Sequence, residues 1–265
     1  MKNKIRGEFI LKFLIVGDVC GRPGREAFRK YVPELKKEHN IDVVVVNGEN
    51  IAGGRGISRK TLDEIYRAGA DIVTSGNHIW DQKEIVSFID DEPFLIRPAN
   101  YPEGAPGKGY CIYPFKAKNI GVINVSGRTF MPPMDCPFQK VDEILKEIKN
   151  QCDIILVDIH AEATSEKIAM GFYKVTCVVG THTHVQTADN RILPKGTAYI
   201  SDLGMVGPYN SSLGINVNNA IDKFITCRPV RFEMAEGPNI FSAVVLELAE
   251  DNSVKSFERI LFNEE

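Results

Sequence analysis

The most constraining feature of this sequence is a repeated pattern, in which a short apolar run leads directly into a polar side chain that can bind a metal ion. The runs are Leu11–Val16, Val43–Val46, Asp71–Thr74, Asp153–Ile159 and Val175–Val179. The polar residues that follow them are Asp18, Glu49, Asn50, Asn77, His78, His160, His182 and His184. Short apolar runs of this kind are typical of buried strands. Ligands in open α/β sheets bind outside the carboxyl ends of the strands, so we expect these side chains to share one edge.

Between the predicted strands lie segments with helical spacing of apolar residues, which favours an α/β fold. These segments are Pro23–His39, Ser58–Ala68, Asp81–Phe88, Gln139–Lys149 and Thr164–Gly171. Two long strand candidates close the chain, Phe241–Leu248 and Val254–Phe262, and they could run antiparallel to the others. We therefore predict a single domain over residues 1–265, with residues 1–10 as an N-terminal extension. Two sheets pack face to face with helices outside, and the segments 128–138 and 201–219 are expected to be loops. The segment 201–219 could form a rim over the site or simply connect two elements.

Composition excludes several classes of protein. The 32 basic and 35 acidic residues give a net charge of −3, so no strong overall field attracts nucleic acid or an anionic membrane. The six cysteines form no Cys-x-x-Cys pair, which favours reduced thiols and a cytoplasmic protein. No apolar stretch approaches the roughly 20 residues that span a bilayer, and the N-terminus lacks a signal-peptide pattern. A homo-oligomer is compatible with this composition.

Each polar residue also has a simpler explanation when it is considered alone. An aspartate after a strand, such as Asp18, usually caps a helix or forms a turn. His160 could be a buried histidine held by a carboxylate, and only the His182-x-His184 spacing is more specific. However, four of the five histidines follow predicted strands, and only His39 does not. This concentration is what indicates a shared metal site.

The kinds of ligand narrow the choice of metal. Carboxylate, amide oxygen and imidazole suit manganese, iron or zinc better than a thiolate cluster would. The set is too large for one ion and fits two ions about 3.5–4 Å apart. Such a pair lowers the pKa of a bridging water, and the resulting hydroxide attacks phosphorus. A carboxylate between the ions offsets their mutual repulsion.

Five motifs, in order along the chain, carry a resemblance to a known family. They are GDVCGRPGR at 17–25, NGENIAGG at 47–54, SGNHIWD at 75–81, DIHAEATSEK at 158–167 and GTHTHVQTAD at 180–189. From about Lys12 to the C-terminus the chain resembles the YmdB-type branch of the calcineurin-like metallophosphoesterases. The resemblance implies a four-layer α/β/β/α sandwich, a centre of two iron or manganese ions, and hydrolysis of 2′,3′-cyclic nucleotides such as cAMP and cGMP.

The resemblance also implies roles for single residues. Asp18, Asn50 and His184 would hold a first metal ion, while Asn77, His160 and His182 would hold a second. Glu49 would bridge the two ions. His78 would act as the general acid and not as a ligand, a role that suits a side chain with an ordinary pKa of about 6.5.

The chain departs from the broader superfamily at the first metal. Most members carry Asp-x-His at the first strand, whereas this sequence has Asp18-Val-Cys20. The first metal thus loses one imidazole, and Asn50 is expected to complete its coordination. Direct ligation by Cys20 is disfavoured.

Three further residues have open interpretations. Arg55 could pair with phosphate oxygens or could be a solvated loop arginine. Phe130 could stack on a base, although a surface loop fits it better, and Trp80 fits a packing residue.

Two other functions compete with that of a cyclic-nucleotide phosphodiesterase. The same centre could serve a phosphomonoesterase such as a nucleotidase, and comparing diester with monoester turnover separates the two. The chain could also be a metal-dependent regulator that acts through a partner protein. Glu49→Gln would separate catalysis from such a scaffolding role.

Overall fold

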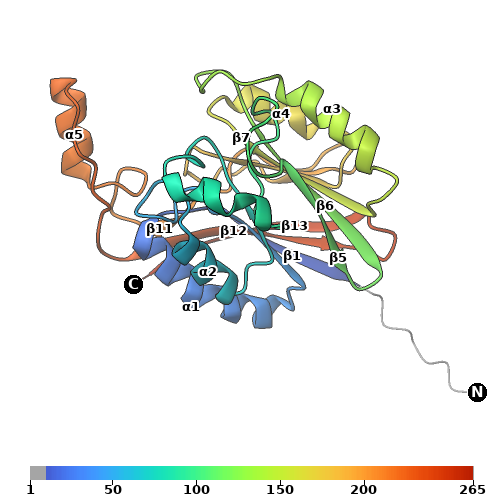
Figure 1. The fold of residues 1–265 in the computed structure, drawn as a ribbon. Helices are drawn as coiled ribbons and strands as arrows, with labels where there is room; N and C mark the ends of the chain where they lie inside the picture. Colours follow the sequence, from blue (N-terminus) through green and yellow to red (C-terminus); the bar gives the residue numbers. More distant parts are fainter. Residues whose placement is uncertain (1–9, 265) are drawn as a thin grey trace, which may run out of the picture.

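Four layers make up the molecule, and three separate apolar cores lie between them. The computed structural model describes residues 10–264. Two helices cover one sheet and two cover the other, with the two sheets packed against each other in the middle (Figure 1). This is the predicted α/β/β/α sandwich.

The first sheet has seven strands and mixed directions. In order they are β2 (Asp18–Val19), β11 (Met205–Pro208), β12 (Asn239–Leu248), β1 (Leu11–Val16), β3 (Val43–Asn47) and β4 (Ile72–Thr74), with β13 (Val254–Asn263) also pairing β12. β1, β3 and β4 run parallel, whereas β12 runs antiparallel to β1 and β13 antiparallel to β12. The predicted mixed sheet is therefore confirmed, although of the two tail strands only β12 opposes β1, and β13 runs in the same direction as β1.

The second sheet has six strands. In order they are β5 (Tyr110–Phe115), β6 (Lys118–Ser126), β7 (Ile154–His160), β8 (Cys177–Thr181), β10 (Ala198–Ile200) and β9 (Arg191–Ile192). β6, β7, β8 and β10 run parallel, so their carboxyl ends meet at one edge.

Side-chain alternation along the central strands explains why the sheets stack. In β1, Phe13 and Ile15 point into the core between the sheets, while Leu14 and Val16 point to the helices outside. The valines of β3 alternate in the same way and all of them are buried. A strand apolar on both faces must be covered on both faces, which is why Val43–Val46 is a continuous apolar run.

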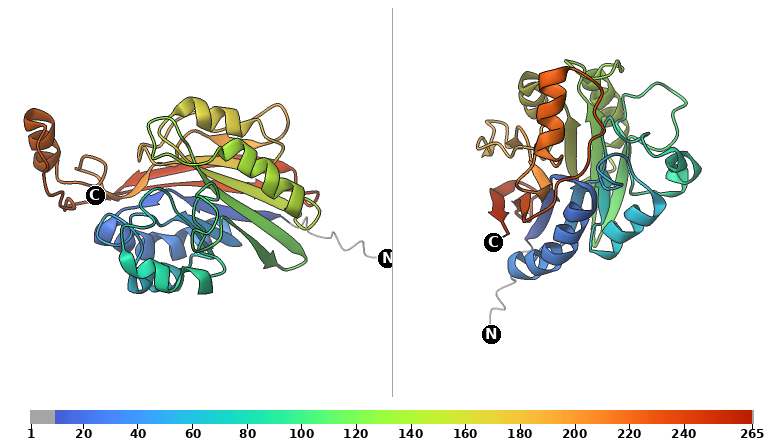
Figure 2. Two further views of the ribbon diagram at one scale, coloured as in Figure 1. Left: turned by 45° about the horizontal axis from the view of Figure 1, so that its top comes forward. Right: turned by 90° about the vertical axis from the view of Figure 1, so that its left-hand side faces the viewer.

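Helices α1 (Gly21–His39) and α2 (Arg59–Arg67) cover the first sheet, and α3 (Pro137–Ile148) and α4 (Thr164–Gly171) cover the second (Figures 1 and 2). Ser58 caps α2, because its side chain accepts a hydrogen bond from the backbone N–H of Thr61. Within residues 10–264, no helix combines the length and the apolar character needed to cross a bilayer.

Two local predictions were wrong. The segment expected to be a helix over Asp81–Phe88 forms only a short 3₁₀ turn, Lys83–Ser87, and a second turn, Ile89–Asp91, follows it. Phe88 separates the two turns because its φ of −141° is not helical. The segment predicted as a loop over 201–219 contains β11 and the start of a fifth helix, α5 (Val217–Thr226). α5 stands clear of the sandwich (Figures 1 and 2), and only Ala220 of its residues is buried. Residues 1–9 of the predicted N-terminal extension lie outside the described residues.

Candidate metal centre

The eight polar residues singled out in the sequence come from both sheets. Asp18 lies in β2, Glu49 and Asn50 follow β3, and Asn77 and His78 follow β4. From the second sheet, His160 ends β7, while His182 and His184 follow β8. Because the two sheets stack, the residues after their parallel strands converge on one site.

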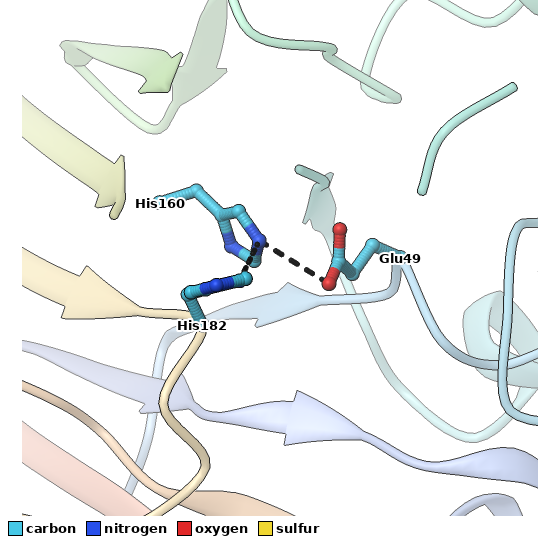
Figure 3. A group of neighbouring side chains, drawn as sticks. All are labelled: Glu49, His160 and His182. Atoms are coloured by element: carbon cyan, nitrogen blue, oxygen red, sulfur yellow. Dashed lines mark hydrogen bonds and ion pairs between the residues drawn. The ribbon is translucent and has the colours of Figure 1, made fainter. Parts of the chain in front are cut away.

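Glu49, His160 and His182 form one of two close groups of side chains, shown in Figure 3. Their candidate ligand atoms all lie within 4.8 Å of one another. His160 Nε2 lies 3.2 Å from Glu49 Oε1, 3.1 Å from His182 Nδ1 and 3.1 Å from Asn77 Oδ1. A single ring nitrogen cannot make good hydrogen bonds to three such atoms at once. A cation at their centre would bind all four atoms. We call Asn77, His160 and His182, with Glu49, the second subsite.

Asp18, Glu49 and His184 form the other group, again with candidate ligand atoms within 4.8 Å. His184 Nε2 lies 3.7 Å from Asp18 Oδ1 and 3.3 Å from the Asn50 side-chain amide. Asp18 is fully buried, and its Oδ1 atom has no hydrogen-bond partner. An unpartnered buried carboxylate oxygen is costly and is what a bound cation would satisfy. Asp18, Asn50 and His184, with Glu49, form the first subsite.

The pKa values show how strongly these groups affect each other. Burial raises the pKa of Asp18 to about 7. Burial would also raise the pKa of Glu49, but the charge and hydrogen bond of His160 outweigh it and lower that pKa below its usual range. Burial and the charge of His160 lower the pKa of His182 to about 3. The site therefore keeps carboxylates and imidazoles in close contact away from water, which suits metal binding.

A buried hydrogen-bond chain orients His160. Its Nδ1 lies 2.9 Å from the hydroxyl of Thr181, which donates to Asp158 Oδ1 at 2.8 Å. Asp158 Oδ2 accepts a second hydroxyl hydrogen bond, from Thr74 at 2.5 Å. Since the Thr181 proton is used by Asp158, the hydroxyl oxygen accepts from His160 Nδ1–H. That tautomer leaves Nε2 free to bind a metal.

The two histidines after β8 have outer partners of a different kind. His182 Nε2 lies 3.3 Å from a carboxylate oxygen of Glu162, and His184 Nδ1 lies 3.2 Å from the backbone oxygen of Leu213. The Cys20 thiol is 3.7 Å from the same nitrogen of His184. Cys20 therefore lies behind the imidazole and does not belong to either group of candidate ligands.

A buried ion pair holds the turn between these two histidines. His182 and His184 have φ values of 101° and 63°, which are strained for residues other than glycine. Asp202 accepts hydrogen bonds from the backbone and the hydroxyl of Thr183, at 3.0 and 2.7 Å, and pairs with Lys167 at 2.8 Å. This pairing stabilises the strained conformation that aims both imidazoles at the centre.

His78 lies beside the two subsites and belongs to neither group of candidate ligands. Its Nδ1 is 2.9 Å from a carboxylate oxygen of Asp81, and its backbone N–H donates to Glu49 Oε2 at 3.1 Å. Its side chain is 26% exposed and lines the cleft above the site. This position is compatible with proton donation to a substrate.

The cleft above the centre has a volume of about 320 Å³. His78, Arg55 and Glu162 line it together with the candidate ligands. It also has apolar lining residues, Leu213, Ile215 and Met234. The first two lie in the segment 201–219, for which a rim over the site was one of the two interpretations, whereas the sequence did not point to Met234. Phe130 does not line the cleft and is 90% exposed, which fits the surface-loop interpretation. Trp80 packs edge-on against Tyr101, as expected of a packing residue.

Sequence comparisons identify similar proteins along nearly the whole chain. Residues 14–260 match the model of the family described as YmdB-like protein. The chain is 50% identical over 260 residues to the 2′,3′-cyclic-nucleotide 2′-phosphodiesterase of Bacillus subtilis (strain 168), covering 96% of this chain and 98% of that protein.

Two solved structures are similar to this chain in both fold and sequence. A hypothetical protein from Thermus thermophilus has a TM-score of 0.91 and 39% identity, covering 96% of this chain and all of that one. A novel phosphatase from Mycoplasma pneumoniae has a TM-score of 0.91 and 35% identity, covering 97% and 95%. The NAD nucleotidase of Haemophilus influenzae has a TM-score of 0.59 and 14% identity, covering 96% and 56%, and this likeness bears on the fold alone.

Proposed function

The chain belongs to the YmdB-like family, and on this basis we propose that it is a di-metal phosphodiesterase that hydrolyses 2′,3′-cyclic nucleotides. The family resemblance predicted from the five motifs is confirmed. The relative in Bacillus subtilis carries this activity in its name. The 50% sequence identity between the two proteins, over 96% of this chain, supports the same substrate class here.

The observation that carries the proposal is the presence of Glu49 in both groups of candidate ligands. A carboxylate shared between two sets of imidazole and oxygen ligands is what a two-metal centre requires. The donors are carboxylate, amide and imidazole, which favours iron or manganese and also accommodates zinc. Asp18, Asn50 and His184 would hold one ion, and Asn77, His160 and His182 the other.

Two bound metal ions would lower the pKa of a water molecule and offset the charge of the phosphate. The protein's own part is to place the phosphate and to supply a proton. Hydrolysis forms one P–O bond to water and breaks the bond from phosphorus to a ribose oxygen. His78 would donate a proton to that leaving oxygen. Asp81 engages Nδ1 of His78, so Nε2 is the nitrogen available to donate.

The name of the same relative supports a proposal for which ester bond opens. The relative is named a 2′-phosphodiesterase, so the corresponding reaction here would break the bond to the ribose 2′-oxygen. The product would then be a nucleoside 3′-monophosphate.

The test is a substrate panel with the protein loaded with manganese or iron. We expect hydrolysis of 2′,3′-cAMP to 3′-AMP, measured by chromatography, and hydrolysis of bis-p-nitrophenyl phosphate. Protein that contains metal but leaves both diesters intact would contradict the proposal.

A phosphomonoesterase is the second candidate, because a related structure from Mycoplasma pneumoniae is described as a phosphatase. The panel therefore includes p-nitrophenyl phosphate and 3′-AMP as monoesters. Turnover of the monoesters above that of 2′,3′-cAMP would favour this function instead.

A further inference from the structure

One side of the cleft is apolar, although the metal centre beside it is polar. Leu213, Ile215 and Met234 line this side, and we call these three residues the apolar wall. Leu213 is 49% exposed, and the other two are half-buried. Apolar side chains open to a polar site are typical of the part of a pocket that binds the apolar portion of a ligand.

The wall is built at the base of the segment that carries α5. Ile215 pairs with Met234 in an isolated antiparallel bridge. On either side of this bridge, the backbone N–H of Asn216 donates to the oxygen of Glu233, and that of Ala235 donates to the oxygen of Gly214, each at 2.9 Å. The two chain segments that supply the wall are therefore fixed to each other.

Glycines make room for Met234 beside the site. Gly54 has φ +94°, and a Cβ atom built there would lie 2.5 Å from Met234 Sδ. Gly21, with φ +59°, would place a Cβ atom 3.0 Å from the end of the same side chain. Gly54 lies in the loop that follows β3, and Gly21 is the first residue of α1, directly after the short strand β2. A side chain at Gly54 would have to displace Met234, so the absence of one lets the wall pack directly on the site loops.

The wall is also tied to a candidate metal ligand. The backbone oxygen of Leu213 lies 3.2 Å from His184 Nδ1, so the loop that presents Leu213 also orients the imidazole. A ligand whose phosphate lies at the metal centre would thus meet the wall at a fixed distance. Leu213 has φ 56°, a strained conformation that is often found at binding sites.

We propose that the apolar wall binds the nucleobase of the substrate while its cyclic phosphate lies at the metal centre. This inference rests on the proposed function. The base is the flat, least polar part of a cyclic nucleotide, and the ribose and phosphate offer no comparable surface. The thioether of Met234 makes favourable contacts with aromatic rings. Because the three side chains carry no hydrogen-bond donors or acceptors that select one base, the wall accepts purines and pyrimidines alike.

The experiment compares a substrate that has a base with one that lacks it. For the manganese-loaded protein, kcat/KM is measured with 2′,3′-cAMP and with glycerol 1,2-cyclic phosphate. Met234→Ser and Ile215→Ser should each lower the ratio of the two values by about tenfold, the scale of losing apolar contact in a pocket. Ile221→Ser is the matched control, because Ile221 is an exposed isoleucine of α5 that does not line the cleft. It should leave the ratio unchanged, and thermal melting checks that each variant is folded.

A binding measurement separates failure of this inference from failure of the proposed function. Calorimetry gives the affinity of the manganese-loaded protein for 3′-AMP relative to inorganic phosphate. The wall predicts that Met234→Ser and Ile215→Ser each lower this relative affinity about tenfold and that Ile221→Ser does not. If neither cyclic ester is hydrolysed but this difference persists, the proposed reaction is wrong and the base subsite is supported. If Met234→Ser and Ile215→Ser change neither ratio, the inference is overturned.

Discussion

The two subsites share Glu49 but differ in what orients their histidines. In the second subsite, His160 is fully buried, and its outer nitrogen leads through Thr181 to Asp158 inside the sandwich. In the first subsite, the outer nitrogen of His184 meets the backbone oxygen of Leu213 and the thiol of Cys20. One histidine is oriented from the sheets, and the other from a loop.

This difference predicts different sensitivity to substitution. Buried, fully satisfied hydrogen-bond networks hold side chains in one orientation, and partners of metal-bound histidines raise metal affinity. His160 depends on one hydroxyl, so removing that hydroxyl leaves its outer nitrogen without a partner. His184 has two neighbours at its outer nitrogen, so losing one of them is offset by the other. Removing one hydrogen-bond partner should thus lower metal affinity more at the second subsite, through His160, than at the first subsite, through His184.

The largest effect on catalysis is expected from Glu49, because both subsites share this residue. Glu49→Gln removes the charge that would bridge the two ions, so both subsites should bind metal more weakly. We expect kcat for 2′,3′-cAMP to fall by at least about 10³-fold, the upper scale for losing one electrostatic contribution to catalysis. Steady-state kinetics measure the fall in kcat, and metal analysis of the same preparation measures the weaker metal binding. Turnover within tenfold of the unmodified protein would show that Glu49 is not the bridge.

A second substitution tests a residue that lies outside both subsites. His78→Ala should lower kcat by about 10²-fold or more, which is the scale of a lost general acid. Metal content should stay near that of the unmodified protein, because His78 belongs to neither group of candidate ligands. Loss of one ion per chain would instead identify His78 as a ligand.

The hydrogen-bond chain behind His160 offers a matched pair of variants. Thr181→Val removes the hydroxyl between His160 and Asp158, whereas Thr74→Val removes another hydroxyl that donates to Asp158 but does not contact His160. Thr181→Val should weaken binding at the second subsite by about 10–100-fold. Thr74→Val should weaken it much less.

Metal titration followed by mass spectrometry measures both variants, and Thr181→Ser should restore binding because it keeps the hydroxyl. Equal losses in Thr181→Val and Thr74→Val would mean that the effect comes from Asp158 and the core, and not from the orientation of His160.

The smallest effect is expected at the first subsite. Cys20→Ala removes the thiol beside His184 but leaves the backbone oxygen of Leu213 as its partner. Metal affinity there should fall by less than about tenfold, below the usual range for removing a sole outer partner. A larger loss, or loss of one ion per chain, would show that the thiol is itself a ligand.

The sequence predicted the elements that pack an apolar face on a core and failed where burial does not decide the structure. The run Val43–Val46 became β3, and Thr164–Gly171 became α4 with the predicted bounds. α5 was missed because the prediction extended a polar loop through Asn219, although apolar residues follow at helical spacing. The apolar pattern of this helix does not face a core, because only one of its residues is buried.

The sequence likewise pointed to some residues around the site and missed others. The sequence singled out eight residues because each lies at or just after the end of a strand, which is a local feature of the sequence. The hydrogen-bond chain behind His160 was missed because it depends on the register between β7 and β8, which places His160 opposite Thr181. Such pairing is set by how two distant segments align. The apolar wall was predicted only in part. A rim over the site was one interpretation of 201–219, but Met234 was missed because a bridge between separate segments brings it beside Ile215.

The central claim is that one glutamate joins two metal subsites in this chain. The most direct test is the amount of metal bound per chain after saturation with manganese, measured by elemental analysis of the unmodified protein beside Asp18→Ala and His160→Ala. The account predicts two ions for the unmodified protein and one for each variant, because each variant removes a ligand of a different subsite. A single ion in the unmodified protein, or no loss in either variant, would contradict it.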